Sequence, residues 1–241
     1  MSGYIEKENK LSLKWLPLAW FSFILTCLVF GVIGGIVQGD PTKPILESGI
    51  VGDIAIFAIG VHEIGMIIAI GILFFLMWKN GISFSRIGLK GKLSLKGIGY
   101  AVVGTIIAFL MYPLIEMIIK ALGTTMYWGS DSINLISLSD IALTFIFVVV
   151  LAPVLEEILF RGYILTAFME KMKNRYFAIL LAALIFSSIH FFFGPGLIVY
   201  IFFWSFMPTF LYLKTKNLYS GMLMHLLNNL LAYIIFPLLH S

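Results

Sequence analysis

Apolar residues fill long, nearly uninterrupted stretches of this chain, and short polar segments separate them. A helix needs about 20 apolar residues to cross the roughly 30 Å hydrocarbon layer of a membrane. Stretches that approach this length cover residues 16–37, 50–78, 97–119, 140–162, 177–193, 196–213 and 218–239. None of them alternates apolar and polar residues as the strands of a membrane β-barrel do. The pattern predicts an all-α transmembrane bundle of about seven spans.

The composition supports a membrane-embedded protein. Of the 241 residues, 61% are hydrophobic and only 12% are charged, and the mean hydropathy is +1.04. A soluble domain of this size could not cover that much apolar surface with polar residues. We therefore expect one domain over residues 1–241, surrounded by the lipid bilayer. Its net charge of +4 is interpreted as a sign of membrane topology, and no nucleic acid is expected as a partner.

The basic residues occur mainly in every second loop. Thirteen of the sixteen lysines and arginines lie before the first stretch or in the loops after the second, fourth and sixth stretches. The loops on the other side hold only Lys43 and Lys120, and Arg161 lies inside a stretch. Loops rich in lysine and arginine stay on the cytoplasmic side. The N-terminus is therefore predicted in the cytoplasm and the C-terminus outside. In the outer loop before the fourth stretch, Ser139-Asp140 is expected to cap the helix that follows.

Few side chains inside the predicted spans are ionisable or carry an amide, and hydrocarbon does not solvate such groups. The candidates among them are His62, Glu63, Glu116, Glu156, Glu157, Arg161, His190, His225, Asn228 and Asn229. Glu116 can pair with Lys120 one helical turn away, so we interpret it as structural. His62 and Glu63 begin a His-Glu-x-x-His zinc motif, but Met66 replaces its second histidine. For these two residues we expect a structural or cavity-lining role.

Spacing distinguishes the two adjacent glutamates of the fourth stretch. Glu157 and Arg161 are four residues apart, so they lie on one helix face and can form an ion pair. Glu156 is turned about 100° away from Glu157 and lacks that partner. Pro153 removes a backbone donor just before them and disfavours a straight helix. A buried ion network that only fixes helix packing would show the same spacing.

Depth in the membrane connects Glu156 with His190. Glu156 lies 15 residues before Lys171, and His190 lies 15 residues after Arg175. At the rise of an α-helix, both are about 22 Å from the basic ends of their helices. Two spans therefore bring a carboxylate and an imidazole to the same depth.

The last stretch adds an imidazole and an amide near this depth. His225 and Asn229 are four residues apart on one helix face. They lie about 13 Å and about 20 Å from Lys216 by the same rise. Asn228 is also within helical reach of His225, but we favour Asn229. We expect one intramembrane cavity to be lined by Glu156, His190, His225 and Asn229.

Such a set of side chains can activate water. A carboxylate with imidazoles and an amide can hold a water, remove its proton and stabilise an oxyanion. The same carboxylate and imidazoles could instead bind Zn²⁺ and leave one position for water. Both alternatives stay open, with Glu156, His190 and His225 as the candidate zinc ligands.

Three motifs, in this order, resemble those of the CPBP family of intramembrane proteases, which includes CAAX prenyl endopeptidases and bacterial Abi-type proteins. EEILFR (Glu156–Arg161) resembles the family's E-E-x-x-x-R signature. FSSIH (Phe186–His190) and HLLNN (His225–Asn229) resemble its F-x-x-x-H and H-x-x-x-N motifs. The resemblance covers about residues 142–239, with an expected catalytic core at 140–239. It implies hydrolysis of peptide bonds within the membrane.

The resemblance also implies a role for each motif residue. Glu156 would be the general base, which orients and deprotonates a water together with His190. His225 and Asn229 would stabilise the tetrahedral oxyanion. The supporting ion pair would be formed by Glu157 and Arg161.

A membrane-associated peptide or protein is the substrate that the resemblance implies. Bacterial relatives are associated with maturation of peptide pheromones, with bacteriocin self-immunity and with turnover of membrane proteins. We therefore expect a multi-pass protein of a bacterial cytoplasmic membrane. Two other functions remain open. A proton-coupled transporter also places glutamate and histidine at mid-membrane depth, and a fold of this kind can act as a non-catalytic scaffold.

Overall fold

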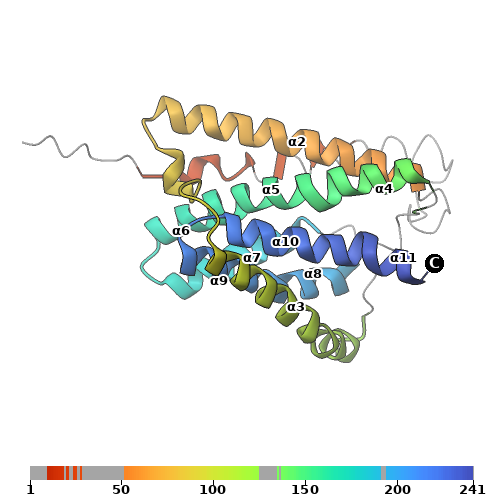
Figure 1. Ribbon diagram of the computed structural model, residues 1–241. Coiled ribbons are helices and arrows are strands. Elements are labelled where there is room, and N and C mark those ends of the chain that lie inside the picture. The colour runs from red at the N-terminus through yellow and green to blue at the C-terminus, as the bar shows by residue number, and fades with distance from the viewer. Residues whose placement is uncertain are drawn as a thin grey trace, which may run out of the picture.

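The computed structural model describes residues 10–18, 20–21, 24–25, 28, 52–124, 135, 137–190 and 194–240. Every regular element in this part of the chain is helical (Figure 1), and the described residues contain no strand. The predicted all-α class is therefore confirmed.

The described helices are named here in chain order. In order, the α-helices are α2 (Gly52–Lys79), α3 (Leu95–Ala121), α4 (Leu138–Thr144), α5 (Ala152–Glu156), α6 (Thr166–Lys171), α7 (Arg175–Ser188), α8 (Gly194–Trp204), α9 (Phe206–Thr215), α10 (Tyr219–Leu230) and α11 (Phe236–His240). Short 3₁₀ turns are η1 (Leu13–Trp15) and η3 (Phe84–Ile87), and wider π-helical segments are η5 (Phe145–Leu151), η6 (Glu157–Leu165) and η8 (Leu231–Ile235).

Five of the seven predicted spans appear as helices that are long and apolar enough to cross a membrane. They are Gly60–Lys79, Leu95–Ala121, Leu138–Lys171, Gly194–Thr215 and Tyr219–Leu239. The predicted span at 177–193 corresponds to the shorter apolar helix α7. The predicted span at 16–37 falls largely outside the described residues. The count of seven and the orientation of the termini therefore stay predictions.

Helix α10 occupies the middle of the bundle (Figure 1), where it packs against α3, α9, η5 and α5. Small residues allow α3 and α10 to approach closely. A side-chain carbon at Gly104 would lie 3.3 Å from the sulfur of Met224. The hydroxyl of Thr105, next to Gly104, lies 3.4 Å from the Met224 carbonyl. Small residues commonly have this role between membrane helices. In lipid, helices associate mainly through van der Waals packing, and small residues let the two backbones approach closely.

The helix from Leu138 to Lys171 contains two π-helical segments, one on each side of α5, which holds Pro153. It is π-helical before α5 and again after it, in η5 and η6. The amide of Ala152 donates five residues back, to the carbonyl of Phe147. Pro153 has no amide hydrogen, so it cannot continue this series. The helix is thus irregularly wound on both sides of Pro153, and the chain accommodates the proline by wider turns rather than by a break.

The capping residue of α4 differs from the expectation. Ser137, not Ser139-Asp140, is the N-cap. The Ser137 hydroxyl accepts a hydrogen bond from the Asp140 amide at 3.2 Å. The Asp140 carboxylate accepts in return from the Ser137 amide at 2.8 Å. This reciprocal arrangement needs an acid three residues after the cap, so the helix begins two residues earlier than Ser139 would allow.

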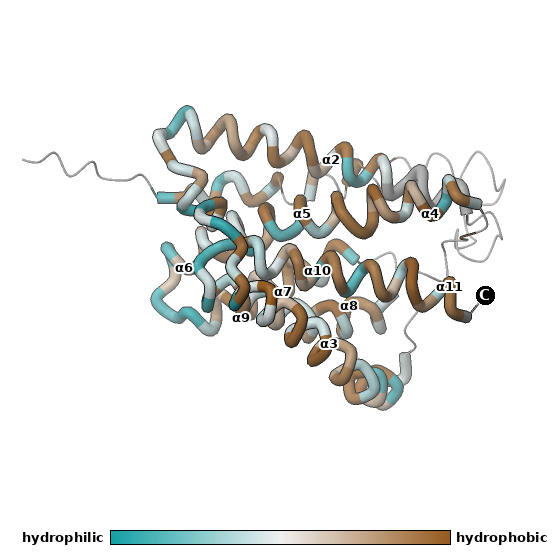
Figure 2. Tube along the Cα trace, in the orientation of Figure 1, coloured by the Kyte–Doolittle hydropathy of each residue, from teal (hydrophilic) through white to brown (hydrophobic). Residues whose placement is uncertain are grey.

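The outer surface of the bundle is apolar along much of its length. Figure 2 shows hydrophilic residues concentrated at the end of the bundle where α6 and α9 terminate. Along α3, by contrast, large apolar side chains such as Leu110, Leu114 and Met117 are exposed. A protein surrounded by water seldom exposes a continuous apolar surface of this extent. The exposed face of α3 is suited to contact with lipid.

Candidate active site

The two glutamates lie at the junction of α5 and η6, in the interior of the bundle. Glu156 is 7% exposed and Glu157 is not exposed. Every residue of η6 is buried as well, because α7, α9 and η3 pack around this segment. The wide turns of η6 thus place charged groups where neither water nor lipid surrounds them. Each charge then needs a partner within the protein.

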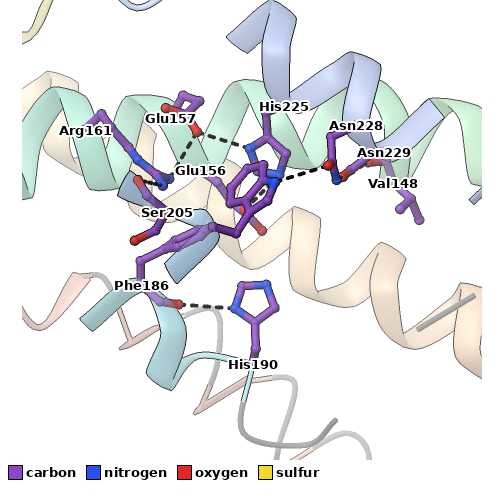
Figure 3. Close-up of polar contacts among 11 residues, drawn as sticks. Val148, Glu156, Glu157, Arg161, Phe186, His190, Ser205, His225, Asn228 and Asn229 are labelled. Carbon is purple, nitrogen blue, oxygen red and sulfur yellow. Dashed lines mark hydrogen bonds and ion pairs between the residues drawn. The ribbon is translucent and has the colours of Figure 1, made fainter. Parts of the chain in front are cut away.

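Glu157 has the predicted ion-pair partner and one more (Figure 3). Its Oε1 atom lies 3.0 Å from Nη1 of Arg161 and 3.1 Å from Nδ1 of His225. Arg161 also donates from Nη2 to the Ser205 carbonyl at 3.2 Å, and its guanidinium stacks on the Phe186 ring at 4.2 Å. The predicted pairing of Glu157 with Arg161 is confirmed. The sequence did not predict that this pair also holds His225.

Gly221 makes room for the second oxygen of Glu157. A side-chain carbon at Gly221 would lie 3.2 Å from Oε2 of Glu157. That oxygen is buried and has no hydrogen-bond partner among the described residues. A larger residue at position 221 would push α10 away from the glutamate. The glycine thereby sets the distance at which His225, one turn further along α10, contacts Glu157.

His225 lies between the two glutamates. Because the Glu157 carboxylate accepts the hydrogen bond at Nδ1, that nitrogen is the donor, and Nε2 is turned toward the other side. Nε2 lies 3.8 Å from Oε2 of Glu156. This separation is too long for a direct hydrogen bond, but it makes Glu156 and His225 immediate neighbours. Glu156 therefore lacks the tight ion pair of Glu157, as the spacing predicted, and has an imidazole beside it.

Among the described residues no hydrogen bond or ion pair joins His190 directly to Glu156, and the expectation that both line one cavity stays a prediction. Nδ1 of His190 bonds to the carbonyl of Phe186 at 3.2 Å. The Phe186 ring meets both imidazoles edge-on, His190 at 5.2 Å and His225 at 6.4 Å between ring centres. His190 also interacts electrostatically with His225 and Arg161. His190 thus belongs to the same cluster, but it is joined to the cluster through Phe186.

Asn229 supports the irregular helix next to the glutamates. Its Nδ2 atom donates to the carbonyl of Val148 at 2.9 Å. In the π-helical pattern this carbonyl would accept from residue 153, which is a proline and has no hydrogen to donate. The Asn229 amide group supplies the missing donor. Since an amide nitrogen carries two hydrogens, the second one is left for another acceptor.

Asn228 has a different contact. Its Oδ1 atom accepts from the indole nitrogen of Trp204 at 3.1 Å, and its Nδ2 atom lies 3.4 Å from Oδ1 of Asn229. The Trp204 ring in turn packs against His225, with 4.6 Å between ring centres. The two asparagines therefore form one hydrogen-bonded pair, and the preference for Asn229 as the functional amide stays a prediction.

Helix α2 contributes a third carboxylate to this region. Glu63 is 2% exposed, and α2 packs against α5 and η5. The Glu63 carboxylate interacts electrostatically with Glu156, and His62 does so with His190. Whether His62 and Glu63 have a structural or a cavity-lining role stays a prediction. In the sequence, these two residues could be recognised only as ionisable side chains within an apolar stretch. Their motif does not match a zinc site.

The zinc alternative requires the side chains of Glu156, His190 and His225 to gather around one point. The described residues contain no group of three or more His, Cys, Asp or Glu side chains that could hold a metal ion. The Phe186 ring contacts both His190 and His225 edge-on. Zinc binding by Glu156, His190 and His225 stays a prediction, which metal analysis of the purified protein would test. No step below passes through a metal.

Residues 138–231 match the model of a family described as type II CAAX prenyl endopeptidase, Rce1-like. The predicted family is confirmed for this segment. We call it the endopeptidase segment; it runs from the start of α4 to the end of α10 and holds six predicted site residues, Glu156, Glu157, Arg161, His190, His225 and Asn229. Helices α2 and α3 precede it. No curated protein and no solved structure matches the chain.

The family and the fold together define the class of protein. The endopeptidase family is one of proteases, which supports a hydrolase. Five helices of the described residues can cross a membrane. Both findings point to a multi-pass integral membrane protein with a peptide or protein substrate in the membrane.

Proposed function

We propose that the protein is an intramembrane endopeptidase that hydrolyses a peptide bond with a water activated by Glu156. The observation that carries this proposal is the arrangement around His225. Its Nδ1 atom is held by the buried Glu157–Arg161 pair, and its Nε2 atom is turned toward Glu156 at 3.8 Å. A carboxylate beside an oriented imidazole, buried in a membrane span, is a combination that general acid–base catalysis uses.

The proposed reaction needs only the side chains of the chain itself. Glu156 accepts a proton from water, whose oxygen attacks the carbonyl carbon of the scissile bond. The bond from this carbon to nitrogen then breaks, and the leaving nitrogen takes the proton from Glu156. Hydrogen-bond donors around the oxygen of the tetrahedral intermediate lower the barrier. The second amide hydrogen of Asn229 is one such donor, and Nε2 of His225 is another whenever it carries a proton.

His190 is proposed as a second group that orients the water. The Phe186 carbonyl can only accept a hydrogen bond, so Nδ1 of His190 is the protonated nitrogen in the neutral ring. Its Nε2 atom is then an acceptor. Movement of the Phe186 ring on substrate binding would let this acceptor reach the water, and hydrogen bonds of active sites often tighten only in the complex with substrate.

For the substrate we propose a membrane-associated peptide, with a bacterial peptide pheromone or bacteriocin precursor as the first candidate. The family description favours a second candidate, a peptide with a prenylated C-terminal cysteine. Both have a cleavable bond held near a membrane surface. The proposed location is a bacterial cytoplasmic membrane.

The experiment that tests the function compares membrane and secreted peptides from host cells. The cells carry the wild type, Glu156→Ala or the control Glu116→Ala at matched expression. Glu116 is a glutamate of α3 outside the cluster, paired with Lys120. We expect at least one peptide to be processed with the wild type and the control but not with Glu156→Ala. If Glu156→Ala restores every phenotype of a deletion strain, the protein acts without proteolysis, as a scaffold.

A further inference from the structure

A second polar site lies at the end of the bundle where α6 and α9 terminate. There, a cavity of about 230 Å³ opens between η3, α6 and the end of α9. Its wall includes Arg86, Lys90, Thr166, Glu170, Tyr212 and Lys216. None of these residues belongs to the cluster around Glu156. The site has no part in the reaction proposed above.

The cavity carries an excess of positive charge. Its one carboxylate, Glu170, already has two partners. The Arg86 Nε atom donates to Oε1 at 2.6 Å, and the backbone amide of Leu11 donates to Oε2 at 3.0 Å. Lys90 and Lys216 are exposed and form no ion pair with any described residue. With Glu170 compensated by Arg86, two positive charges face the cavity and can hold an anion.

The backbone at Lys216 has an unusual conformation. Lys216 has φ 59°, and among the described residues it is the one non-glycine residue with a positive φ. Its amide donates to the Tyr212 carbonyl at 2.8 Å and closes the end of α9. Glycine fills such left-handed caps at the lowest cost. A lysine here adds strain and places a cation at the wall of the cavity.

The level of the cavity in the membrane narrows the choice of anion. Lys216 follows directly on the span that ends at Thr215, and Glu170 lies in the last turn of the span that ends at Lys171. The ends of apolar spans lie at the level of lipid headgroups. Basic pockets between helices at this level bind the phosphates of anionic headgroups.

The C-terminal carboxylate of a substrate peptide fits this place less well. Glu170 lies 14 residues after Glu156 along one helix, a distance of about 20 Å. A peptide extends by at most about 3.5 Å per residue. A short leaving peptide cut beside Glu156, such as a tripeptide, would therefore end before it reached the cavity.

We propose that this cavity binds the phosphate of an anionic lipid headgroup, held by Lys90 and Lys216. Inorganic phosphate offers the same chemistry without the acyl chains, so the two sources must be compared. Headgroup binding at this point would tie α6, α9 and η3 together at the membrane surface.

The test measures thermal unfolding of the full chain in a neutral detergent. Dioctanoyl phosphatidylglycerol, dioctanoyl phosphatidylcholine and inorganic phosphate are added separately over a range of concentrations. We expect only phosphatidylglycerol to raise the unfolding temperature in a saturable way. The double variant Lys90→Gln/Lys216→Gln should bind it about twenty-five-fold more weakly, at roughly fivefold for each lysine. The matched control Lys92→Gln/Lys173→Gln removes two exposed lysines outside the cavity wall and should bind as the wild type does.

Three results would overturn the proposal. Equal weakening in the control pair would mean that net charge, and not the cavity, attracts the lipid. Equal protection by inorganic phosphate would mean that the ligand is a soluble anion. Full binding by Lys90→Gln/Lys216→Gln would mean that phosphatidylglycerol binds elsewhere. A charge-keeping variant, Lys90→Arg/Lys216→Arg, should retain binding, which guards against loss of folding as the explanation. Binding is measured without turnover, so the result is independent of the protease proposal.

Discussion

Glu157–Arg161 and Glu116–Lys120 are both glutamate–cation pairs four residues apart on a helix, and their closest atoms are 3.0 Å and 2.9 Å apart. Their surroundings differ. The side chains of Arg161 and Glu157 are 2% and 0% exposed, whereas those of Lys120 and Glu116 are 67% and 34% exposed. The buried pair also contacts His225, and the exposed pair does not. The two pairs have the same spacing and similar distances, but removing one charge should cost more stability in the buried pair. The surroundings set the cost of leaving a charge unpaired.

The largest effect is expected when the buried pair loses its cation. Arg161→Met removes the charge and keeps much of the side-chain volume. It leaves the Glu157 carboxylate uncompensated in the interior, which costs about 3–5 kcal/mol. Denaturant unfolding of the purified protein should show this loss. A variant as stable as the wild type would show that Glu157 does not depend on Arg161.

Removing both charges separates stability from function. In Glu157→Leu/Arg161→Met neither member of the pair is left behind as an unpaired charge, and such replacements are often neutral for stability. We expect the double variant to be clearly more stable than Arg161→Met alone. It should still be inactive, because Nδ1 of His225 has lost its acceptor. Unfolding and peptide cleavage measured on the same preparation test both parts, and an active double variant would contradict the role given to Glu157.

A contact between uncharged groups at the same site shows whether any buried polar group loses stability when its partner is removed. Asn229→Leu leaves the carbonyl of Val148 without a donor, and a buried unsatisfied polar group costs about 1–3 kcal/mol. If Pro153 is the reason that Val148 needs this donor, the same substitution should cost less in a Pro153→Ala background. A double-mutant cycle of unfolding free energies measures the coupling. Equal costs in both backgrounds would refute the link between Pro153 and Asn229.

The smallest effect is expected at the exposed pair. Glu116→Gln/Lys120→Gln removes both charges from the surface of α3, where solvent already screens them. We expect neither the unfolding transition nor peptide cleavage to change measurably. A loss of stability comparable to that of Arg161→Met would mean that spacing, and not burial, determines the strength of such pairs in this protein.

Much of the helical architecture could be predicted from the chain, because span length and apolar runs are local properties. The i, i+4 spacing likewise predicted the Glu157–Arg161 pair. Depth along a helix, however, does not determine which way a side chain is turned. For this reason the similar depths of Glu156, His190 and His225 predicted a shared cavity but could not show which imidazole lies beside Glu156.

Contacts between helices that are distant in the sequence could not be predicted from local sequence patterns. The π-helical turns on both sides of Pro153 follow from a missing donor, but the residue that compensates for it, Asn229, comes from a helix 76 residues further along the chain. The position of Gly221 against Glu157 is of the same kind. Glu63 was recognisable as a buried charge, but its proximity to Glu156 required the packing of α2 on α5.

The decisive measurement is the cleavage rate of Glu156→Gln on a peptide that the wild-type protein processes, with both proteins purified and reconstituted in vesicles. Glutamine keeps the size of the side chain and its capacity for hydrogen bonds but cannot take a proton from water. General-base catalysis typically contributes about 10²–10⁴ in rate. We predict a fall in turnover within or beyond this range, with unfolding and substrate affinity close to those of the wild type. Wild-type turnover by Glu156→Gln would show that another group activates the water.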